Sequence, residues 1–491
     1  MNLSRIIERH AAFAPGQVAL HFDGADITYP QLWQRVEQAT AVLQAAGVRP
    51  GDRVAWLGLN DPSMLVLLFG LARIGAILLP LNYRLAAAEH VAILAHAGAS
   101  MLVADETHAA AAESLGAAGG SKPLPASALR SPSARVAHAT LQGHDHAPVL
   151  LVYTSGTSGR PKGALHRQAG LLWNCINATH ANGLIAADHV LTALPLFHVG
   201  GLCIQTLPAL HAGATVTLHR RFEAATWLAD VARRRPSLSV MVPATLSAVL
   251  ADAGFASTDL SSLKLLVAGS SVVPLALIEA FHARGVPVGQ VYGATETGPV
   301  SIYLRRDEAM RHPGCAGQAG LHVEVRLVGS DGQPVAMGEV GEVWIRGPAV
   351  MSGYWQDDDN PAFRDGWFHS GDLARVDAAG RYWVVGRATD MVISGGENIY
   401  PAEIENILVG CAEIEDAAVL GQDDPVWGEV VVAVVVRRPG SLLDEHAVMR
   451  LFEGALARYK WPARVLFRDQ LPKTALGKVR KPALRDWINS L

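Results

Sequence analysis

Residues 153–163 read Tyr153-Thr154-Ser155-Gly156-Thr157-Ser158-Gly159-Arg160-Pro161-Lys162-Gly163, and they follow an apolar run, residues 149–152, that is typical of a buried strand. The segment holds four Ser/Thr hydroxyls, three glycines and one lysine. Glycines let successive N–H groups turn toward one anion, while hydroxyls add donors and lysine adds a positive charge. The pattern predicts a phosphate-binding loop whose contacts come from Thr154, Ser155, Gly156, Thr157, Ser158, Gly159 and Lys162.

This loop differs from the P-loop of nucleoside triphosphatases. That motif ends in Gly-Lys followed by Ser or Thr, whereas here Gly159 is followed by Arg160 and Pro161. Glycine, serine and threonine are also frequent in ordinary polar loops. The segment alone therefore leaves a plain connecting loop open, and other motifs must decide.

Composition sets wide limits on the function. The chain has 491 residues, of which 50% are hydrophobic and 18% charged, so we expect at least two domains with a large core. The formal net charge of −4 gives no basic footprint for nucleic acid. The four cysteines lack metal-ligand spacing, which favours buried thiols in a reducing compartment and a cytoplasmic protein.

No segment is typical of a membrane span or a secretory signal. The longest apolar run, residues 64–79, is short for a span and carries Arg73. We interpret it as a buried helix that starts after Asp61-Pro62-Ser63 and leads into a strand near residues 77–79.

Hydrophobic patterning predicts an α/β fold. Val/Leu/Ile-rich strands alternate with Ala-rich helical stretches through the first 330 residues, which argues for mostly parallel sheets; the predicted strands span 54–57, 100–103, 149–153, 190–193, 215–218, 240–242 and 263–268. Residues 117–147 are predicted to form an irregular surface excursion, and residues 322–346 antiparallel strands. We place a domain boundary near Thr389, giving domains 1–388 and 389–491.

Two later segments suit the rest of a nucleotide. Tyr292-Gly293-Ala294-Thr295-Glu296-Thr297 combines a ring that can stack on a purine with a hydroxyl and a carboxylate that suit phosphate and Mg²⁺. Ser370-Gly371-Asp372-Leu373 offers a carboxylate that can accept two O–H donors. Taken singly, each segment could also be a turn with a solvated acid.

Further motifs follow in a fixed order: Pro195-Leu196-Phe197-His198, Ala268-Gly269-Ser270-Ser271-Val272-Val273-Pro274, Gly386-Arg387-Ala388-Thr389-Asp390, the segment 394–405 beginning Ser394-Gly395-Gly396-Glu397, and Pro472-Lys473-Thr474-Ala475-Leu476-Gly477-Lys478-Val479. Together these strings resemble the adenylate-forming superfamily of acyl-CoA synthetases, peptide-synthetase adenylation domains and beetle luciferases, over residues 4–486. The family usually has Asp or Lys where Thr389 stands, so the hinge pivot stays open between Thr389 and Asp390.

The resemblance implies a fold and a reaction. It implies a large multi-layer N-terminal domain with two mixed or parallel sheets and a small β subdomain, followed by a small mobile α+β domain. ATP would transfer AMP to a carboxylic acid with Mg²⁺, and coenzyme A would then take the acyl group. The catalytic set would be Lys478, Glu296, Thr154 and His198, with Glu296 as the metal ligand and His198 lining the site without acting as acid or base.

The family pattern also assigns nucleotide and coenzyme A contacts. Besides the phosphate loop these are Gly269, Ser270, Tyr292, Gly293, Thr295, Asp372, Arg387, Gly395, Gly396 and Trp427. Tyr292 would stack on adenine, Asp372 would accept the ribose hydroxyls, and Gly395-Gly396 would enter the site for thioester formation. Tyr459 and Trp461 join Trp427 as aromatic rings that could stack on the coenzyme A adenine or simply pack in a core.

The acyl pocket is expected to draw on Trp173, His198, Val242, Ala268, Ala294 and Pro299. It lacks a cation for a second carboxylate, so a monocarboxylic medium-chain fatty or aromatic acid is predicted. Three rivals remain: an adenylating enzyme that loads a carrier protein, a luciferase-type oxygenase, and a binding protein that keeps the fold. A homodimer is left open.

Overall fold

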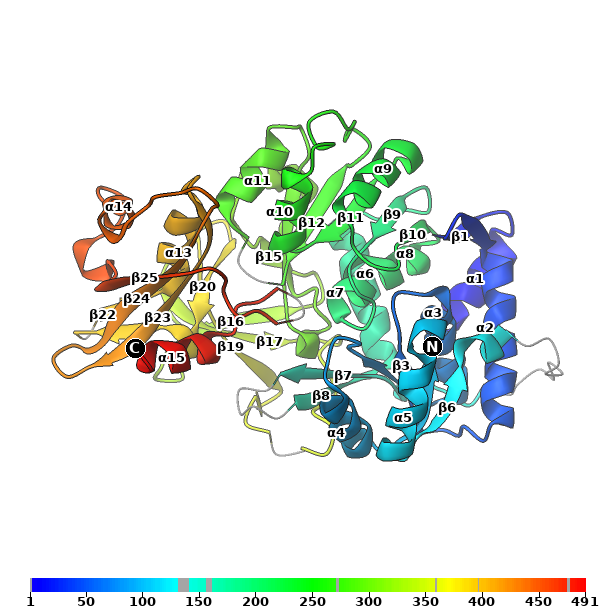
Figure 1. Cartoon of the computed structure of the whole chain (residues 1–491). Coiled ribbons are helices and arrows are strands. Elements are labelled where there is room, and N and C mark those ends of the chain that lie inside the picture. The colour runs from blue at the N-terminus through cyan, green and yellow to red at the C-terminus, as the bar shows by residue number, and fades with distance from the viewer. Residues whose placement is uncertain are drawn as a thin grey trace.

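The computed structural model describes residues 2–130, 141–155, 161–270, 273–357, 360–395, 397–474 and 477–491. Within these residues, strands and helices form a large N-terminal part and a smaller C-terminal part, which lie side by side in Figure 1. No described helix has both the length and the apolar character that crossing a bilayer requires.

A six-stranded sheet is the first layer, in the order β6-β5-β3-β4-β7-β8. Its strands are β3 (Arg53–Leu57), β4 (Ile77–Leu81), β5 (Ala99–Ala104), β6 (Lys122–Pro125), β7 (Pro148–Ser155) and β8 (Pro161–Arg167). Neighbours run parallel except β7 and β8, which pair antiparallel. Helices α4 (Ala87–Ala97) and α5 (Ala109–Gly119) cover one face. The prediction of an irregular excursion over 117–147 was thus partly wrong, because β6 adds a parallel edge strand there; residues 131–140 lie outside the described part.

A nine-stranded sheet is the second layer, in the order β15-β14-β13-β12-β11-β9-β10-β1-β2. Its strands are β1 (Val18–Phe22), β2 (Ala25–Thr28), β9 (His189–Thr192), β10 (Thr215–Leu218), β11 (Leu238–Met241), β12 (Leu265–Gly269), β13 (Val288–Tyr292), β14 (Ile302–Tyr303) and β15 (Gln318–Ala319). The strands from β1 to β13 in this order pair parallel. The predicted parallel strands therefore exist, with shifts of one or two residues at their ends.

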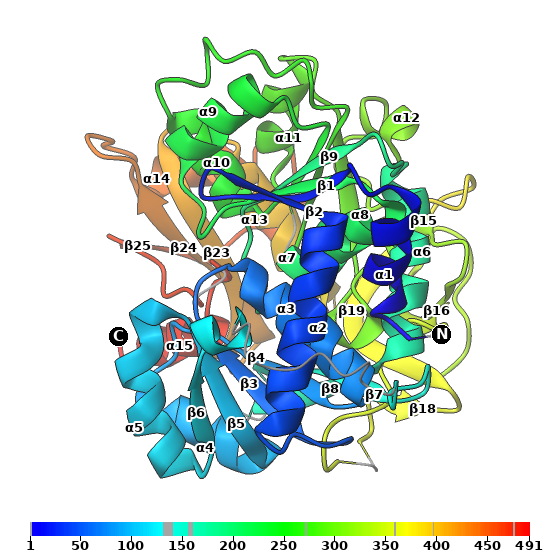
Figure 2. The same cartoon turned by 90° about the vertical axis from the view of Figure 1, so that its right-hand side faces the viewer.

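The largest core cluster fills the space between the two sheets. It contains residues of α1 (Arg5–Phe13), α2 (Tyr29–Ala45), α3 (Pro62–Ile74), α6 (Gln168–Asn182) and α8 (Leu207–Ala212) together with residues of both sheets. Helices α9 (Ala224–Arg234), α10 (Pro243–Ala251) and α11 (Leu275–His282) cover the outer face of the larger sheet, as Figure 2 shows at its upper edge. The predicted buried helix is α3: Asp61 caps its first turn, Gly75 ends it in the left-handed region, and Arg73 stacks on Trp33.

A small antiparallel sheet follows. It comprises β16 (Glu324–Val328), β17 (Val340–Arg346), β18 (Phe363–Arg364), β19 (Trp367–Val376) and β20 (Tyr382–Arg387). The predicted antiparallel pairing over 322–346 is the β16–β17 ladder. The short helix α12 (Arg306–Ala309) lies near β13.

The C-terminal part has its own sheet and cores. Strands β21 (Val392–Ser394), β22 (Glu397–Ile399), β23 (Ile414–Asp424), β24 (Gly428–Arg437) and β25 (Arg464–Arg468) pack with α13 (Pro401–Val409), α14 (Glu445–Arg450) and α15 (Lys481–Asn489). This sheet shares no strand with the others. The exact boundary at residue 389 stays a prediction.

Candidate active site

Several of the predicted site residues lie at the carboxyl ends of strands in the larger sheet. Strands β9, β11, β12 and β13 are neighbours and parallel, so their carboxyl ends lie along one edge. His198 follows β9, Val242 follows β11, Gly269 ends β12 and Tyr292 ends β13. Ligands of open α/β sheets bind outside the carboxyl ends of the strands. The fold therefore brings together residues that are almost a hundred positions apart in sequence.

The phosphate-loop motif connects two paired strands. Thr154 lies opposite Lys162 in the β7–β8 ladder, and Gly163 lies opposite Tyr153. A Cβ on Gly163 would lie 2.8 Å from Leu151 Cδ1, so a larger residue would require the Leu151 side chain to shift. Residues 156–160 lie outside the described part of the chain. The phosphate contacts assigned to Gly156, Thr157, Ser158 and Gly159 therefore stay predictions.

Glu296 lies next to the base of this loop. It belongs to the turn Thr295–Thr297 after β13 and is 9% exposed. Its Oε1 accepts a hydrogen bond from the Tyr354 hydroxyl at 2.8 Å and a longer one from the Thr154 hydroxyl at 3.5 Å. The backbone N–H of Met351 donates to the Glu296 carbonyl at 2.8 Å. The sequence thus places one buried carboxylate beside a phosphate-type loop.

These oxygens suit a hard cation. Among the described residues, no group of three or more His, Cys, Asp or Glu side chains could hold a metal ion by itself. Mg²⁺ is normally held by one or two carboxylates together with substrate phosphates and waters. Glu296 and the hydroxyl of Thr154 fit that donor set, so they would hold Mg²⁺ where it could neutralise phosphate charge.

Asp372 accepts from two side chains at once. The Tyr292 hydroxyl donates to one carboxylate oxygen at 2.9 Å, and the Arg387 guanidinium donates to the other at 2.9 Å. Asp372 and Arg387 are direct partners in the β19–β20 ladder, and Gly371 before them has φ +69°. The Asp372 charge raises the pKa of Arg387, and burial raises the pKa of Tyr292. The alternative of a turn with a solvated acid does not hold, because Asp372 lies within β19, where the pairing with β17 is irregular.

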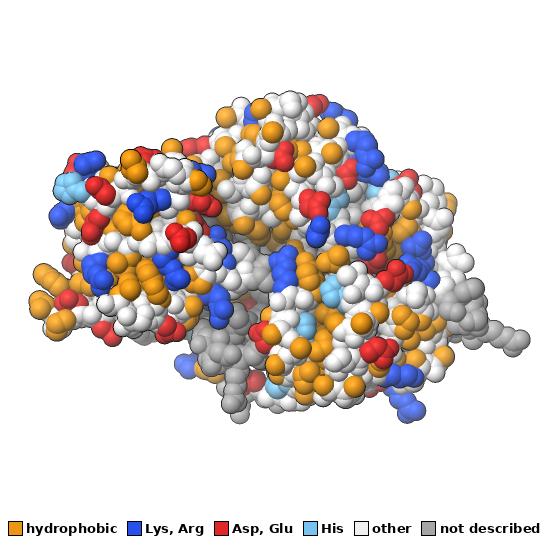
Figure 3. Space-filling view, viewed as in Figure 1, with side chains coloured by type: hydrophobic (Ala, Val, Ile, Leu, Met, Phe, Trp, Pro, Cys, Tyr) orange, Lys and Arg blue, Asp and Glu red, His pale blue; other side chains and the backbone are white. Residues whose placement is uncertain are grey.

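Lys478 reaches this cleft from the C-terminal part. Its backbone is held by a tight hairpin, in which the Thr474 N–H donates to the Lys478 carbonyl at 2.7 Å and Gly477 has φ +79°. A Cβ on Gly477 would lie 3.4 Å from Ala244 Cβ at the start of α10, so the hairpin touches the N-terminal part. Figure 3 shows the surface hollowed between the two parts.

Three charged side chains act on the pKa of the Lys478 ammonium and therefore lie near it. Burial lowers the pKa of its ammonium, the Arg387 cation lowers this pKa further, and the charges of Asp372 and Glu296 raise it. Lys478 is nevertheless exposed to solvent, so the surrounding atoms crowd its ammonium without covering the residue. Lys478, Glu296, Asp372 and Arg387 thus share one electrostatic environment although Lys478 is about a hundred residues or more away in sequence.

His198 is neutral at ordinary pH. Burial, followed by the nearby Lys478 charge, lowers its pKa to about 4. Its Nδ1 accepts from the Gly200 N–H at 3.0 Å, which fixes the orientation of the ring. The neighbouring Phe197 packs edge-on against Tyr83 with ring centroids 5.6 Å apart. The ring is thus neutral and oriented, and its lining role stays a prediction.

Close backbone contacts shape the predicted acyl pocket. A Cβ on Gly269 would lie 2.6 Å from the Val291 carbonyl oxygen, and one on Gly293 would lie 2.1 Å from that of Pro299. Ser270 has φ +76°, a strained value for a non-glycine residue and one often found at binding sites. Residues 271 and 272 lie outside the described part.

The remaining predicted pocket residues differ in environment. Ala268 is fully buried in the core on the outer face of the larger sheet, and Ala294 is partly exposed. Trp173 is 36% exposed and its ring lies 4.9 Å from that of His322. The described ring contact of Trp173 is therefore with a residue outside the predicted pocket.

Gly395 and Trp427 meet in the C-terminal part. The Gly395 N–H donates to the Trp427 carbonyl at 2.8 Å, Gly395 has φ +58°, and an added Cβ would lie 2.8 Å from the indole ring. Trp427 is 57% exposed and Tyr459 is 51% exposed, whereas Trp461 packs on Phe452. Two of the three candidate aromatics are thus free to stack. Gly396 lies outside the described part.

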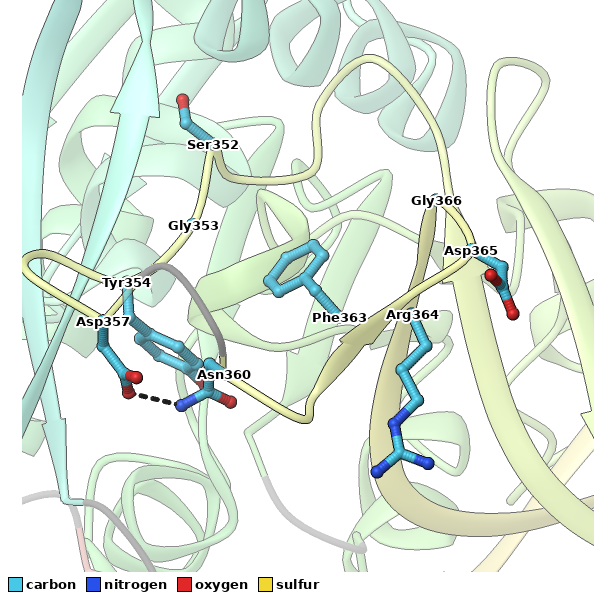
Figure 4. Close-up of a pocket in the computed structure, with 9 residues that line it drawn as sticks. All are labelled: Ser352, Gly353, Tyr354, Asp357, Asn360, Phe363, Arg364, Asp365 and Gly366. Atoms are coloured by element: carbon cyan, nitrogen blue, oxygen red, sulfur yellow. Dashed lines mark hydrogen bonds between the residues drawn. The ribbon is translucent and has the colours of Figure 1, made fainter.

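Sequence reasoning missed Tyr354 and Asp357. Tyr354 forms a bridge with Ala164, and the Trp355 N–H donates to the Gly163 carbonyl at 2.7 Å, so this segment lies along the edge of β8. Asp357 lies 3.9 Å from the Lys162 ammonium. Both line a pocket of about 270 Å³. Figure 4 shows Tyr354 and Asp357 on one side of it, with the Asp357 carboxylate accepting a hydrogen bond from the Asn360 amide, and Phe363 in the middle of the view. Only the glycine before Tyr354 hints at this close approach in the sequence.

Comparison with known proteins agrees with the geometry. The family model of the AMP-binding enzymes matches residues 7–355, and that of the AMP-binding enzyme C-terminal domain matches residues 403–478. An indoleacetate–CoA ligase from Aromatoleum aromaticum is 46% identical over 99% of this chain and 98% of its own length. A feruloyl-CoA synthase from an Amycolatopsis species is 42% identical over 97% of each chain.

A solved structure has the same architecture. An anthranilate CoA ligase in complex with anthranoyl-AMP superposes with a TM-score of 0.93 at 27% identity, covering 100% of this chain and 98% of that one. The chain therefore belongs to the AMP-binding enzyme family and is an AMP-forming acyl-CoA synthetase of the adenylate-forming superfamily.

Proposed function

We propose that this enzyme activates an aromatic monocarboxylic acid with ATP and transfers the acyl group to coenzyme A. The observation that carries the proposal is the convergence of Lys478, Glu296, Asp372 and Arg387 on one cleft. Two relatives above 40% identity are named for aromatic acids, and their names favour an aromatic over a fatty substrate. The predicted pocket residues carry no cation for a second carboxylate.

In the first step, a carboxylate oxygen attacks the α-phosphorus of ATP. A new oxygen–phosphorus bond forms, the bond to the β-phosphate oxygen breaks, and pyrophosphate leaves. Lys478 would stabilise the negative charge that concentrates at the α-phosphate, and Lys162 would bind the outer phosphates. Glu296 and Thr154 would hold Mg²⁺, which neutralises charge on the pyrophosphate.

Asp372, Arg387 and Tyr292 would hold the nucleoside. Asp372 can accept the ribose hydroxyls once its present donors rearrange, and Arg387 would remain as the neighbouring cation. His198, neutral and fixed, would border the carboxylate without taking its proton. These roles are positioning and electrostatics, which can supply most of the barrier reduction.

In the second step, the sulfur of coenzyme A attacks the acyl carbon. The carbon–sulfur bond forms, the carbon–oxygen bond to AMP breaks, and AMP leaves. For this step the C-terminal part would rotate about Thr389 or Asp390, withdrawing Lys478 and presenting Gly395. The exposed ring of Trp427 beside Gly395 would then contact coenzyme A. We further propose that the enzyme is cytoplasmic.

Pyrophosphate release tests the proposal. Purified enzyme with ATP and Mg²⁺ is offered arylacetic, arylpropenoic, benzoic and C6–C12 fatty acids, each with and without coenzyme A. We expect acid-dependent release with the aromatic acids and coenzyme A-dependent formation of AMP and a thioester. Release that coenzyme A does not accelerate would favour a carrier protein as acceptor, and release with fatty acids alone would overturn the aromatic assignment.

A further inference from the structure

Lys162, the lysine of the phosphate-loop motif, lies between a carboxylate and an aromatic ring. Its ammonium is 3.9 Å from Oδ2 of Asp357 and 5.2 Å from the centre of the Tyr354 ring. A carboxylate and the face of an aromatic ring both attract a cation. The cation that the proposed function assigns to the outer phosphates therefore has an anionic partner within the protein.

A buried amide holds the carboxylate of Asp357 in place. Asn360 is 6% exposed, its Nδ2 donates to Asp357 Oδ2 at 2.6 Å, and its Oδ1 accepts from the Ala362 N–H at 3.0 Å. The backbone N–H of Asp357 also donates to the Tyr354 carbonyl at 3.3 Å. Both ends of the Asn360 amide are thus bonded, and one of them fixes the same carboxylate oxygen that faces Lys162.

The ion pair between Lys162 and Asp357 is weak enough to break. The two side chains are 31% and 44% exposed, and at 3.9 Å their charged atoms are not in close hydrogen-bond contact. Exposed pairs of this kind contribute little to stability, because solvent screens the charges. A polyphosphate carries several negative charges and attracts the ammonium more strongly than one carboxylate does. Lys162 can therefore leave Asp357 when a polyphosphate binds and return to it afterwards.

Open space beside Asp357 allows this exchange. Tyr354, Asp357 and Asn360 line one side of the pocket of about 270 Å³ in Figure 4. Asp357 borders this space and is partly exposed, so its side chain can turn without displacing a packed neighbour. Tyr354 is more restricted, because its hydroxyl donates to Glu296 Oε1 at 2.8 Å. Of the two groups that attract Lys162, the ring is thus the fixed one and the carboxylate the movable one.

We propose that Asp357 competes with pyrophosphate for Lys162 and so weakens the hold on pyrophosphate once adenylation has taken place. The carboxylate takes the ammonium back as pyrophosphate leaves, which stabilises the enzyme without its product. The same competition weakens the binding of ATP, because ATP and pyrophosphate use the same cation. The inference rests on the proposed function, which assigns the outer phosphates to Lys162, and adds a residue that acts on product release.

Direct binding tests the proposal and requires no knowledge of the acid. Dissociation constants of MgATP and of magnesium pyrophosphate are measured by titration calorimetry for the wild type and for Asp357→Asn, which keeps the shape of the side chain and removes its charge. We expect both constants to fall about two- to fivefold, the range that one exposed ion pair supplies. Asp365→Asn is the matched control and should change neither constant, because Asp365 lines the same pocket but the ion pair described for Lys162 is with Asp357.

A double variant separates competition for Lys162 from a general effect of charge. Removing any negative charge near a polyphosphate favours its binding, whereas the loss of a competitor for Lys162 matters only when Lys162 is present. In the Lys162→Met background, Asp357→Asn should therefore leave both dissociation constants nearly unchanged.

The possible results lead to different conclusions. Weaker binding in Asp357→Asn would mean that the carboxylate orients Lys162 or holds Mg²⁺, and unchanged binding would mean that it does not compete, so either result overturns the inference. Equal tightening with and without Lys162, or in Asp365→Asn, overturns it as well. A wild-type enzyme that binds neither MgATP nor magnesium pyrophosphate would instead refute the proposed function.

Discussion

The Tyr354 hydroxyl donates a 2.8 Å hydrogen bond to Oε1 of Glu296, across 58 positions of sequence. Burial, followed by the Glu296 charge, raises the pKa of Tyr354, so the phenol remains a donor throughout the working pH range. The bond fixes the direction in which the carboxylate of Glu296 points. An outer partner of this kind orients a metal ligand without touching the metal.

Tyr354→Phe should weaken Mg²⁺ binding during adenylation. Removing the outer partner of a metal ligand typically costs 10–100-fold in metal affinity or activity, so we expect the half-saturating Mg²⁺ concentration to rise about tenfold while the rate at saturating Mg²⁺ changes little. The measurement is a Mg²⁺ titration of pyrophosphate release. Tyr382→Phe, in the core of the small β sheet, serves as control, and an unchanged titration curve for Tyr354→Phe would exclude the orienting role.

Lys478→Ala should separate the two half-reactions. Loss of one charge that stabilises the transition state costs roughly 10²–10³ in rate, so adenylation should fall by that factor. Thioester formation from supplied acyl-AMP should persist, because Lys478 would have left the site for that step. Lys473→Ala is the matched control, since Lys473 lies on the same hairpin but pairs with Asp416. Equal losses in both half-reactions of Lys478→Ala would refute the assigned role.

At high pH the adenylation rate should fall as the Lys478 ammonium loses its proton. Its pKa is lowered from 10.5, so the rate should fall with rising pH earlier than an ordinary lysine would allow. Asp372 raises this pKa and Arg387 lowers it, so Asp372→Asn should move this fall to lower pH and Arg387→Gln to higher pH. The measurement is the pH profile of kcat for each variant. The pH at which kcat falls should shift in opposite directions in the two variants, and a shift in the same direction in both would contradict the prediction.

Much of this site could be predicted from local sequence. The rest could not, because it depends on contacts that form only when distant segments pair. Gly, Ser, Thr and Lys in residues 153–163 carry the chemistry of a phosphate loop in their own types and spacing. Tyr354 has no such signal, because its role arises only when its segment pairs with the edge of β8. The strand β8 itself was not predicted, since its glycine and proline resemble a loop until β7 provides a partner.

Two buried amide side chains of helix α6 also have a role that local sequence does not predict. Asn174 and Asn182 occur within a helical pattern that gives no reason to single them out. Their amides donate to carbonyls of the π-helical turn Leu202–Thr206, and these contacts exist only in the folded structure. Tertiary structure thus decides which of the polar side chains in a helix support a neighbouring turn.

Gly395→Ala should impair thioester formation and spare adenylation. Gly395 has φ +58°, and the added Cβ would lie 2.8 Å from the Trp427 ring, so the indole must move from the surface that coenzyme A is proposed to use. We expect at least a tenfold loss in transfer from acyl-AMP to coenzyme A, by analogy with other misplacements of a reacting group. Gly440→Ala, with φ +85° and open space around the new Cβ, controls for backbone strain. Similar losses in both variants would assign the effect to stability.

His166→Gln should make the protein less sensitive to acid. His166 is 1% exposed, and burial lowers its folded-state pKa to about 4 from 6.5. Between these values the unfolded chain binds a proton that the folded chain does not, so folding stability falls as pH drops below 6.5. At 1.36 kcal/mol per pH unit, the loss between pH 7 and pH 5 is about 2 kcal/mol from this residue.

The measurement is the free energy of unfolding in urea at pH 7 and pH 5. The difference between the two pH values should be about 2 kcal/mol smaller in His166→Gln than in the wild type. His446→Gln on the exposed face of α14 provides the comparison, because its removal touches no buried contact. If His166→Gln and the wild type lose the same stability on acidification, His166 takes up its proton in the folded state as readily as in the unfolded chain.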